Sequence, residues 1–217
     1  MMENEGIIMS LMDPVSCHID VSSGSLTGTD RRYQKRFDDL DGLYADQNSY
    51  QQLKPKLGEQ VVYEVTDYHP GERCQDMIFG VTKMQPGRVG NEFFMTRGHI
   101  HANADRPEVY IGKKGHGLML MESPEGETKV IEIGPDDVCY VPPYWIHRSV
   151  NTGDSEFVMF FCYPSDSGQD YSIIEKSGGM KHRVLSDGNG GWVLSENPEY
   201  QPRSDESIQQ LYRGSVG

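Results

Sequence analysis

The residues of this chain that could do chemistry gather in one stretch, GHIHANADRPEVYIGKKG, which covers residues 98–115. His99 and His101 lie two residues apart in a segment that reads as β-strand, and Glu108 follows seven residues later. Residues i and i+2 of a strand point to the same face, so we expect the two imidazoles to converge. A carboxylate from the next strand can then join them.

A fourth donor is available farther along the chain. His147 lies in PPYWIHRSVNTG, again among residues that favour β-structure. Three neutral nitrogens and one carboxylate are a donor set that Fe, Mn, Ni and Zn accept. The sequence therefore predicts one divalent metal per chain, held by His99, His101, Glu108 and His147. The other histidines, His18, His69, His116 and His182, show no such partner pattern.

The elements that must position these residues read as short strands. From EQVVYEVTDY onward the apolar pattern has a period of two, and turn signals such as QPGRVG, SPEGE and NTGDS separate the runs. The expected strands are DMIFGVTKM, NEFFMTRGHIHA, PEVYIGKKGHGLMLMES, ETKVIEIG, DVCYVPPYWIHRSVN and EFVMFFCYP. Many short strands at even spacing predict an all-β sandwich or barrel.

Helices are expected only at the periphery. Tyr33, Phe37, Leu40 and Tyr44 recur at roughly helical spacing, which predicts a short helix in RRYQKRFDDLDGLYADQ. DYSIIEKSGG is a second candidate helix, and GNGGWVL predicts a tight hairpin. We expect an N-terminal arm over residues 1–30, with an added strand as one alternative. A single domain over 31–198 and a polar, loose tail over 199–217 are expected to follow.

The composition of the chain restricts the kinds of partner that we expect it to bind and the cellular compartment in which we expect it. The net charge of −13 disfavours nucleic acid and anionic membranes, and the chain has no apolar run of about 18 residues that could span a bilayer. The start of the chain has acidic residues where a signal peptide carries basic ones. The four cysteines, Cys17, Cys74, Cys139 and Cys162, are widely spaced without a C-x-x-C pair, which favours reduced thiols and a cytoplasmic location.

The two ligand-bearing segments form a bipartite pattern that resembles the cupin family. The first half is H-x-H, then Glu108 and Gly115; the second is Pro142, His147 and Asn151. The pattern departs from the general cupin form in a long gap before Glu108. Asp136 and Tyr144 also stand where glycine is usual. TRGHIHA, EVYIGKKGHGLMLMESPEGE, YVPPYWIHRSVNTGD and YPSDSGQDYSIIEKSG closely resemble the cupin-type glucose-6-phosphate isomerases of archaea and some bacteria, from about residue 33 to 198.

That resemblance implies a double-stranded β-helix or jelly-roll barrel and an isomerase of glucose 6-phosphate and fructose 6-phosphate. It implies metal ligation by the four residues above. It also implies substrate contacts at Thr82, Thr96, Gly98, Tyr163 and Tyr171. Tyr110, two residues beyond Glu108, should face the same interior. Gln169 stands where the family has histidine, so a ring-opening role for that position is put in doubt.

Two readings of the chemistry stay open at the level of sequence. Glu108 can serve as the base of an enediol route, whereas a hydride shift needs no base. Thr82 and Thr96 can donate hydroxyl hydrogen bonds to phosphate, and the cations Lys83, Arg88, Arg97 and Arg148 can offset the acidic surface. Ordinary strand propensity also explains threonine, and barrel packing also explains tyrosine.

Competing functions are a cupin oxygenase with an iron site and a non-catalytic sugar-phosphate-binding protein. Phosphate-binding threonines favour the isomerase or the binding protein over the oxygenase. Exposed sheet edges are usually paired or covered, which together with the resemblance predicts a homodimer.

Overall fold

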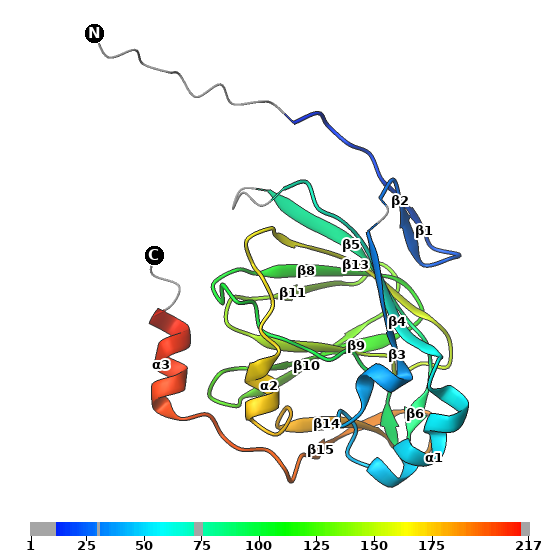
Figure 1. Cartoon of the computed structure of the whole chain (residues 1–217), viewed down its shortest axis with the longest axis vertical. Coiled ribbons are helices and arrows are strands. Elements are labelled where there is room, and N and C mark those ends of the chain that lie inside the picture. Colours follow the sequence, from blue (N-terminus) through cyan, green and yellow to red (C-terminus); the bar gives the residue numbers. More distant parts are fainter. Residues whose placement is uncertain (1–11, 30, 72–75, 214–217) are drawn as a thin grey trace.

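The computed structural model describes residues 12–29, 31–71 and 76–213. A six-stranded antiparallel sheet forms one wall of a barrel (Figure 1). In spatial order its strands are β11 (Val138–Val141), β8 (Glu108–Lys114), β13 (Phe157–Pro164), β5 (Met77–Met84), β4 (Val61–Tyr68) and β3 (Arg32–Arg36). The facing wall consists of β10 (Thr128–Ile133), β9 (Gly117–Glu122) and β12 (Ile146–Val150).

Smaller elements surround the barrel. A four-stranded sheet contains β15 (Trp192–Glu196), β14 (His182–Ser186), β7 (Glu92–Phe93) and β6 (Arg88–Val89), and a separate hairpin pairs β1 (His18–Asp20) with β2 (Ser25–Thr27). The helices are α1 (Gln47–Leu57), α2 (Ser172–Lys176), α3 (Asp205–Arg213) and a 3₁₀ turn, η1 (Phe37–Leu40). The predictions of an all-β fold with short peripheral helices, a helix near 172 and a hairpin near 190 are confirmed. None of the described helices is long and apolar enough to span a membrane.

The chain turns at a glycine where it passes from the six-stranded wall to the facing wall. The run read as one strand from 107 to 123 is two strands, β8 and β9, which belong to different sheets. Gly115 between them has φ +72°, and a Cβ there would lie 2.1 Å from the Glu156 carbonyl oxygen. Only glycine fits this backbone without displacing β13.

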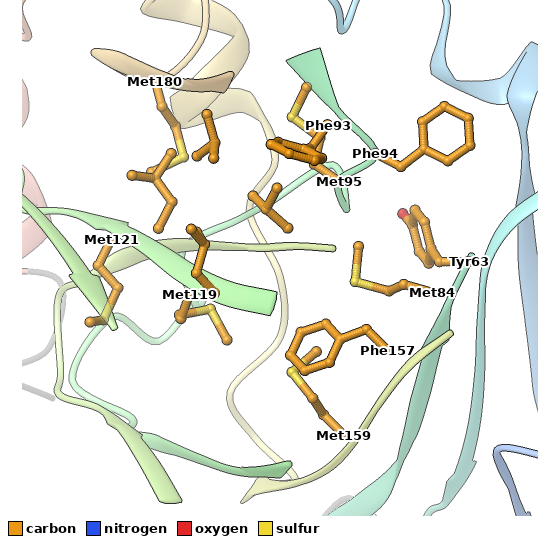
Figure 2. Close-up of a cluster of buried hydrophobic side chains, with 14 of the residues drawn as sticks. Tyr63, Met84, Phe93, Phe94, Met95, Met119, Met121, Phe157, Met159 and Met180 are labelled. Carbon is orange, nitrogen blue, oxygen red and sulfur yellow. The ribbon is translucent and has the colours of Figure 1, made fainter. Parts of the chain in front are cut away.

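The barrel interior is filled by aromatic and methionine side chains from both walls (Figure 2). Met84 and Phe157 come from the six-stranded sheet, and Met119 and Met121 come from β9. All four are buried. The flexible thioethers fill the irregular space between the sheets, as expected for the methionine-rich runs. This core fills the space between the two walls.

The helix predicted over Tyr33–Tyr44 is wrong. Tyr33 pairs with Val65 in the sheet, and the chain then forms η1. The apolar spacing is nevertheless real, because Phe37 and Tyr44 are buried and stack with Tyr50 of α1. Helix α1 escaped notice because Tyr50 is its only buried residue among many Gln and Lys side chains.

The strand expected over NEFFMTRGHIHA is also wrong beyond β7. From Met95 to Ile100 the chain makes isolated bridges only: Met95 with Val150, His99 with His147 and Ile100 with Asp170. Gly98, at φ +74°, interrupts the extended backbone just before the histidines. The ligand-bearing segment is therefore a loop tied to β12 rather than a strand of a sheet.

The expectation of a loose tail is wrong for the described part of residues 199–217, and residues 214–217 lie outside that part. Residues 205–213 form α3, and Tyr212 packs on Tyr144 with ring centroids 4.9 Å apart. Just before the helix, Arg203 donates to Glu122 at 2.6 Å, and the two side chains are only 5% and 1% exposed. This buried ion pair fixes the tail to β9.

We predict that Arg203→Met lowers the free energy of unfolding by roughly 3 kcal/mol, because it leaves the buried Glu122 carboxylate without its cation. Urea unfolding measures the change. Arg213→Met is the matched control, since Arg213 is exposed on α3 and donates to the Gln209 side chain there. Equal effects of the two substitutions would show that the ion pair does not hold the tail.

Candidate metal centre and substrate cavity

Three histidines and one glutamate meet between the two walls of the barrel. Ligand atoms of His99, His101, Glu108 and His147 all lie within 4.8 Å of one another. His99 and His101 come from the loop after β7, Glu108 begins β8, and His147 lies on β12. Reciprocal backbone hydrogen bonds of 3.0 and 2.9 Å between His99 and His147 hold the loop against β12. The predicted donors are thus brought together from both walls.

Two backbone carbonyls fix the orientation of the imidazoles. Nδ1 of His101 lies 2.7 Å from the Arg106 carbonyl oxygen, and Nδ1 of His147 lies 3.1 Å from that of Trp145. A carbonyl only accepts, so each Nδ1 carries the proton. In the neutral rings, Nε2 then presents its lone pair to the centre of the cluster, which is how a metal-binding histidine is held.

The inner atoms of the cluster require a cation. Nε2 of His101 and Nε2 of His147 lie 3.2 and 3.1 Å from the same Glu108 oxygen, Oε2. Lone pairs on neutral imidazoles would repel that carboxylate, so a proton or a metal ion must lie among them. If protons fill that place, hydrogen bonds from both Nε2 atoms more than offset burial, which by itself raises the pKa of Glu108, and hold that pKa well below its usual range.

His99 supplies the observation that favours a metal over protons. Its Nε2 is buried and has no hydrogen-bond partner among the described residues. Burial, helped by the neighbouring His147, lowers the pKa of His99 well below its usual value, so the ring stays neutral. An unpartnered neutral nitrogen beside a carboxylate and two oriented imidazoles fits a divalent metal ion.

Strand register explains why further predicted residues face one cavity. Across the six-stranded sheet, Thr82 is opposite Met159, and Phe161 is opposite Tyr110. Side chains at alternate positions of each strand share a face, so Tyr163 lies on the same side as Phe161. Thr82, Tyr110 and Tyr163 all line one cavity.

The remaining predicted contacts reach the same cavity from loops. Thr96, Gly98 and Tyr171 line it together with His99, Glu108 and His147. The Thr96 oxygen accepts from the Ser149 N–H at 3.1 Å, which leaves its hydroxyl hydrogen free to donate. A Cβ on Gly98 would lie 3.0 Å from the His147 carbonyl oxygen, so this close approach requires glycine. His101 contributes from behind the cavity wall.

Of the four candidate cations, Arg97 alone is a lining residue of the cavity. Its guanidinium stacks 4.6 Å from the centre of the Tyr171 ring and pairs with Glu175 at 2.8 Å. Lys83 instead donates to the Ser23 carbonyl oxygen. Arg148 is buried behind the wall, where it donates to the Arg97 carbonyl oxygen at 2.6 Å.

Sequence reasoning missed several cavity residues. Tyr33, Tyr63 and Asp67 line it and belong to no ligand-bearing motif, whereas Ser149 lies in the motif around His147 but had no predicted role. For Tyr63 and Asp67 the signal was present, because they lie two residues to either side of Val65 and so share its face of β4. Their face could be chosen only once the sheet was closed.

Two of the three departures from the general pattern, Asp136 and Tyr144, fall on left-handed backbone. Asp136 and Tyr144, at φ +68° and +71°, are the non-glycine residues with positive φ among those the structure describes. Glycine is the usual residue for such a conformation. Tyr144 N–H donates to the Ala104 carbonyl oxygen at 2.6 Å, which ties the turn before His147 to the loop after His101.

We predict that His99→Ala lowers metal affinity by at least the ~10–100-fold that loss of even an outer-sphere partner costs. The measurement is metal content per chain by elemental analysis after dialysis against limiting metal. His116→Ala is the control, since His116 is exposed at a turn. Unchanged metal content in His99→Ala would contradict the assignment of this ligand.

Comparison with known proteins identifies the relatives of the chain. Residues 34–201 match the family model described as glucose-6-phosphate isomerase (GPI). The chain is 52% identical to the glucose-6-phosphate isomerase of Sinorhizobium medicae, covering 93% of this chain and 94% of that one. It is 39% identical to that of Thermococcus litoralis, covering 89% and 100%. A solved oxalate oxidase superposes on 51% of this chain and 55% of its own, with 16% identity and a TM-score of 0.43. The chain therefore belongs to the cupin-type glucose-6-phosphate isomerase family.

Proposed function

We propose that this chain interconverts glucose 6-phosphate and fructose 6-phosphate with the help of one divalent metal ion. The observation that carries the proposal is the composition of a single cavity. A group of histidines and one glutamate suited to a metal lies at the same cavity as hydroxyls and a glycine suited to phosphate. A phosphorylated polyol needs both at once, and the family membership supports the same reaction.

The phosphate end is assigned to Thr82, Thr96 and Gly98. Both threonines can donate hydroxyl hydrogen bonds, and the glycine lets an anion approach the backbone closely. Arg97 adds a positive charge at the same cavity. These groups hold the substrate so that its other end lies at the Glu108 carboxylate, which converts binding energy into orientation of the reacting carbons.

The reacting end is assigned to His99, His101, Glu108 and His147, which would hold the metal. When bound, a divalent ion supplies Lewis-acid stabilisation of charge developing on the C1 and C2 oxygens. Both imidazole contacts to Glu108 use Oε2, so Oε1 is the oxygen that can exchange a proton with the substrate carbon. Burial and the nearby Glu108 raise the pKa of Tyr110 well above its usual value, so its hydroxyl stays protonated and donates.

The proposal extends to the setting of the enzyme. Cys17, Cys139 and Cys162 are free thiols, which fits a cytoplasmic location, while Cys74 lies outside the described residues. Val138 and Tyr140 are exposed on β11, the edge of the six-stranded sheet, which fits a homodimer of one-domain chains. Light scattering at micromolar concentration tests the dimer, and a monomeric mass would contradict it.

We predict that the purified chain converts fructose 6-phosphate to glucose 6-phosphate in an assay coupled to glucose-6-phosphate dehydrogenase. Chelation should abolish the activity, because the cation that balances Glu108 among neutral imidazoles is removed. Mn, Fe, Ni and Zn are then restored separately to identify the metals that support turnover. Absence of turnover with all of them would favour a non-catalytic sugar-phosphate-binding protein.

We predict that Glu108→Gln lowers kcat by at least ~100-fold, the lower range of a general base, if the reaction follows the enediol route. Elemental analysis must show that the variant keeps its metal. Turnover in deuterated water gives a second readout, since a base exchanges the transferred hydrogen with solvent. A metal-loaded Glu108→Gln variant that stays active without deuterium incorporation would establish the hydride shift instead.

A further inference from the structure

One carboxylate on the cavity wall has no part in the chemistry described above. Asp67, on β4, is a lining residue of the cavity and is only 8% exposed. Its strand partner is Gly80 on β5, where a Cβ would lie 2.6 Å from the Phe161 ring and 2.8 Å from the Asp67 Cβ. Glycine is required at position 80 because the Asp67 and Phe161 side chains already fill the space beside it, and Asp67 lines the cavity from there.

Two side chains behind Asp67 connect it to solvent. His69 Nε2 lies 2.9 Å from Asp67 Oδ2, and the His69 side chain is 27% exposed. Arg31 Nε lies 3.3 Å from Oδ1, and its side chain is 59% exposed. A carboxylate on the cavity wall that contacts an imidazole open to water is an arrangement through which a proton can pass.

The other groups on the wall are poorly suited to take and return a proton. Burial raises the pKa values of Tyr163 and Tyr171, so their hydroxyls stay protonated. Gln169 has no titratable group, and its amide oxygen accepts from the Tyr171 hydroxyl. Arg97 is always charged. Apart from the metal-ligand group, Asp67 is thus the acid–base candidate among the described lining residues.

The sheet register puts Asp67 between the two ends of the substrate, if the proposed function holds. On β4 and β5, Val65 is opposite Thr82 and Asp67 is opposite Gly80. Residues that are opposite one another across the strands lie at the same level of the sheet. Phe161 and Tyr110 lie at the level of Asp67, and Glu108, two residues before Tyr110, lies at the next level on that face. Asp67 therefore lies between the level of the phosphate group and the level of the reacting carbons.

This position, between the phosphate group and the reacting carbons, corresponds to one atom of the sugar, the oxygen O5. In a hexose 6-phosphate, O5 is bonded to C5, next to the phosphorylated carbon, and it closes both the glucose pyranose and the fructose furanose ring. Isomerisation acts on the open chain, so the ring must open first and close afterwards. We propose that Asp67, with His69 behind it, exchanges the proton of O5 during ring opening and closure.

The proton balance of opening is simple. In fructose 6-phosphate the C2–O5 bond breaks, the anomeric hydroxyl loses its proton to water in the cavity, and C2 becomes a carbonyl. O5 receives a proton from Asp67, which recovers one from His69, and His69 recovers its own from solvent. In closure to glucose 6-phosphate the same steps run in reverse at the C1–O5 bond. Asp67 is the catalytic residue in this scheme, and His69 is a positioning residue.

The test separates ring opening from isomerisation by means of the substrate. 5-Deoxyfructose 6-phosphate has no O5 and remains open-chain, so its isomerisation, followed by NMR, needs no group at O5. We expect Asp67→Asn to lower kcat with fructose 6-phosphate by roughly 100-fold, as loss of an acid–base group does, and to leave kcat with the 5-deoxy substrate unchanged. His69→Gln should show the same selectivity with a smaller loss.

Two further variants test whether the loss of activity comes from a disturbed structure rather than from the missing acid–base group. Glu64→Gln removes another buried carboxylate of β4, one that pairs with Arg32 and does not line the cavity, and it should affect neither substrate. Gln169→His introduces a titratable group at the same cavity and should restore turnover of fructose 6-phosphate to Asp67→Asn. Equal losses with both substrates would overturn the inference. Failure of the unaltered protein to isomerise either substrate would instead overturn the proposed function.

Discussion

The arrangement of this protein depends on a buried carboxylate that neutral imidazoles surround. Glu108 is 2% exposed, and two oriented nitrogens face one of its oxygens. Such a group is costly to bury unless a cation lies beside it. The carbonyl groups that orient His101 and His147 are therefore as important as the ligands, because they direct lone pairs rather than protons toward the centre.

The same constraint explains the strained and close-packed backbone around the site. Gly98 brings the loop within contact of β12, and Tyr144 adopts a left-handed conformation so that its N–H reaches the opposite loop. Neither feature belongs to a regular sheet. Both are the consequence of bringing ligands from separate walls to one point, where misplacement of a nitrogen by a fraction of an ångström weakens the centre.

The register of the six-stranded sheet determines the order in which different chemical groups follow one another along the cavity. Successive levels across β4, β5, β13 and β8 present hydroxyl, carboxylate and metal-ligand side chains in sequence. A substrate that carries phosphate at one end and a carbonyl at the other spans these levels. The Arg183–Glu92 ion pair, at 2.9 Å, joins β14 to β7 within the outer four-stranded sheet and does not enter the cavity.

The sequence by itself determined the donor set and the class of fold. His99, His101, Glu108 and His147 are identifiable because metal coordination restricts residue type and spacing, and period-two patterning is a local property of each strand. Helix α1 and the order of the tail were not predictable, since one buried tyrosine and one Arg203–Glu122 pair hold them through distant contacts. Asp67 and His69 stayed hidden for the same reason. A strand pattern tells which residues share a face, but only the closed barrel decides which face meets the cavity and which residues lie at the same level.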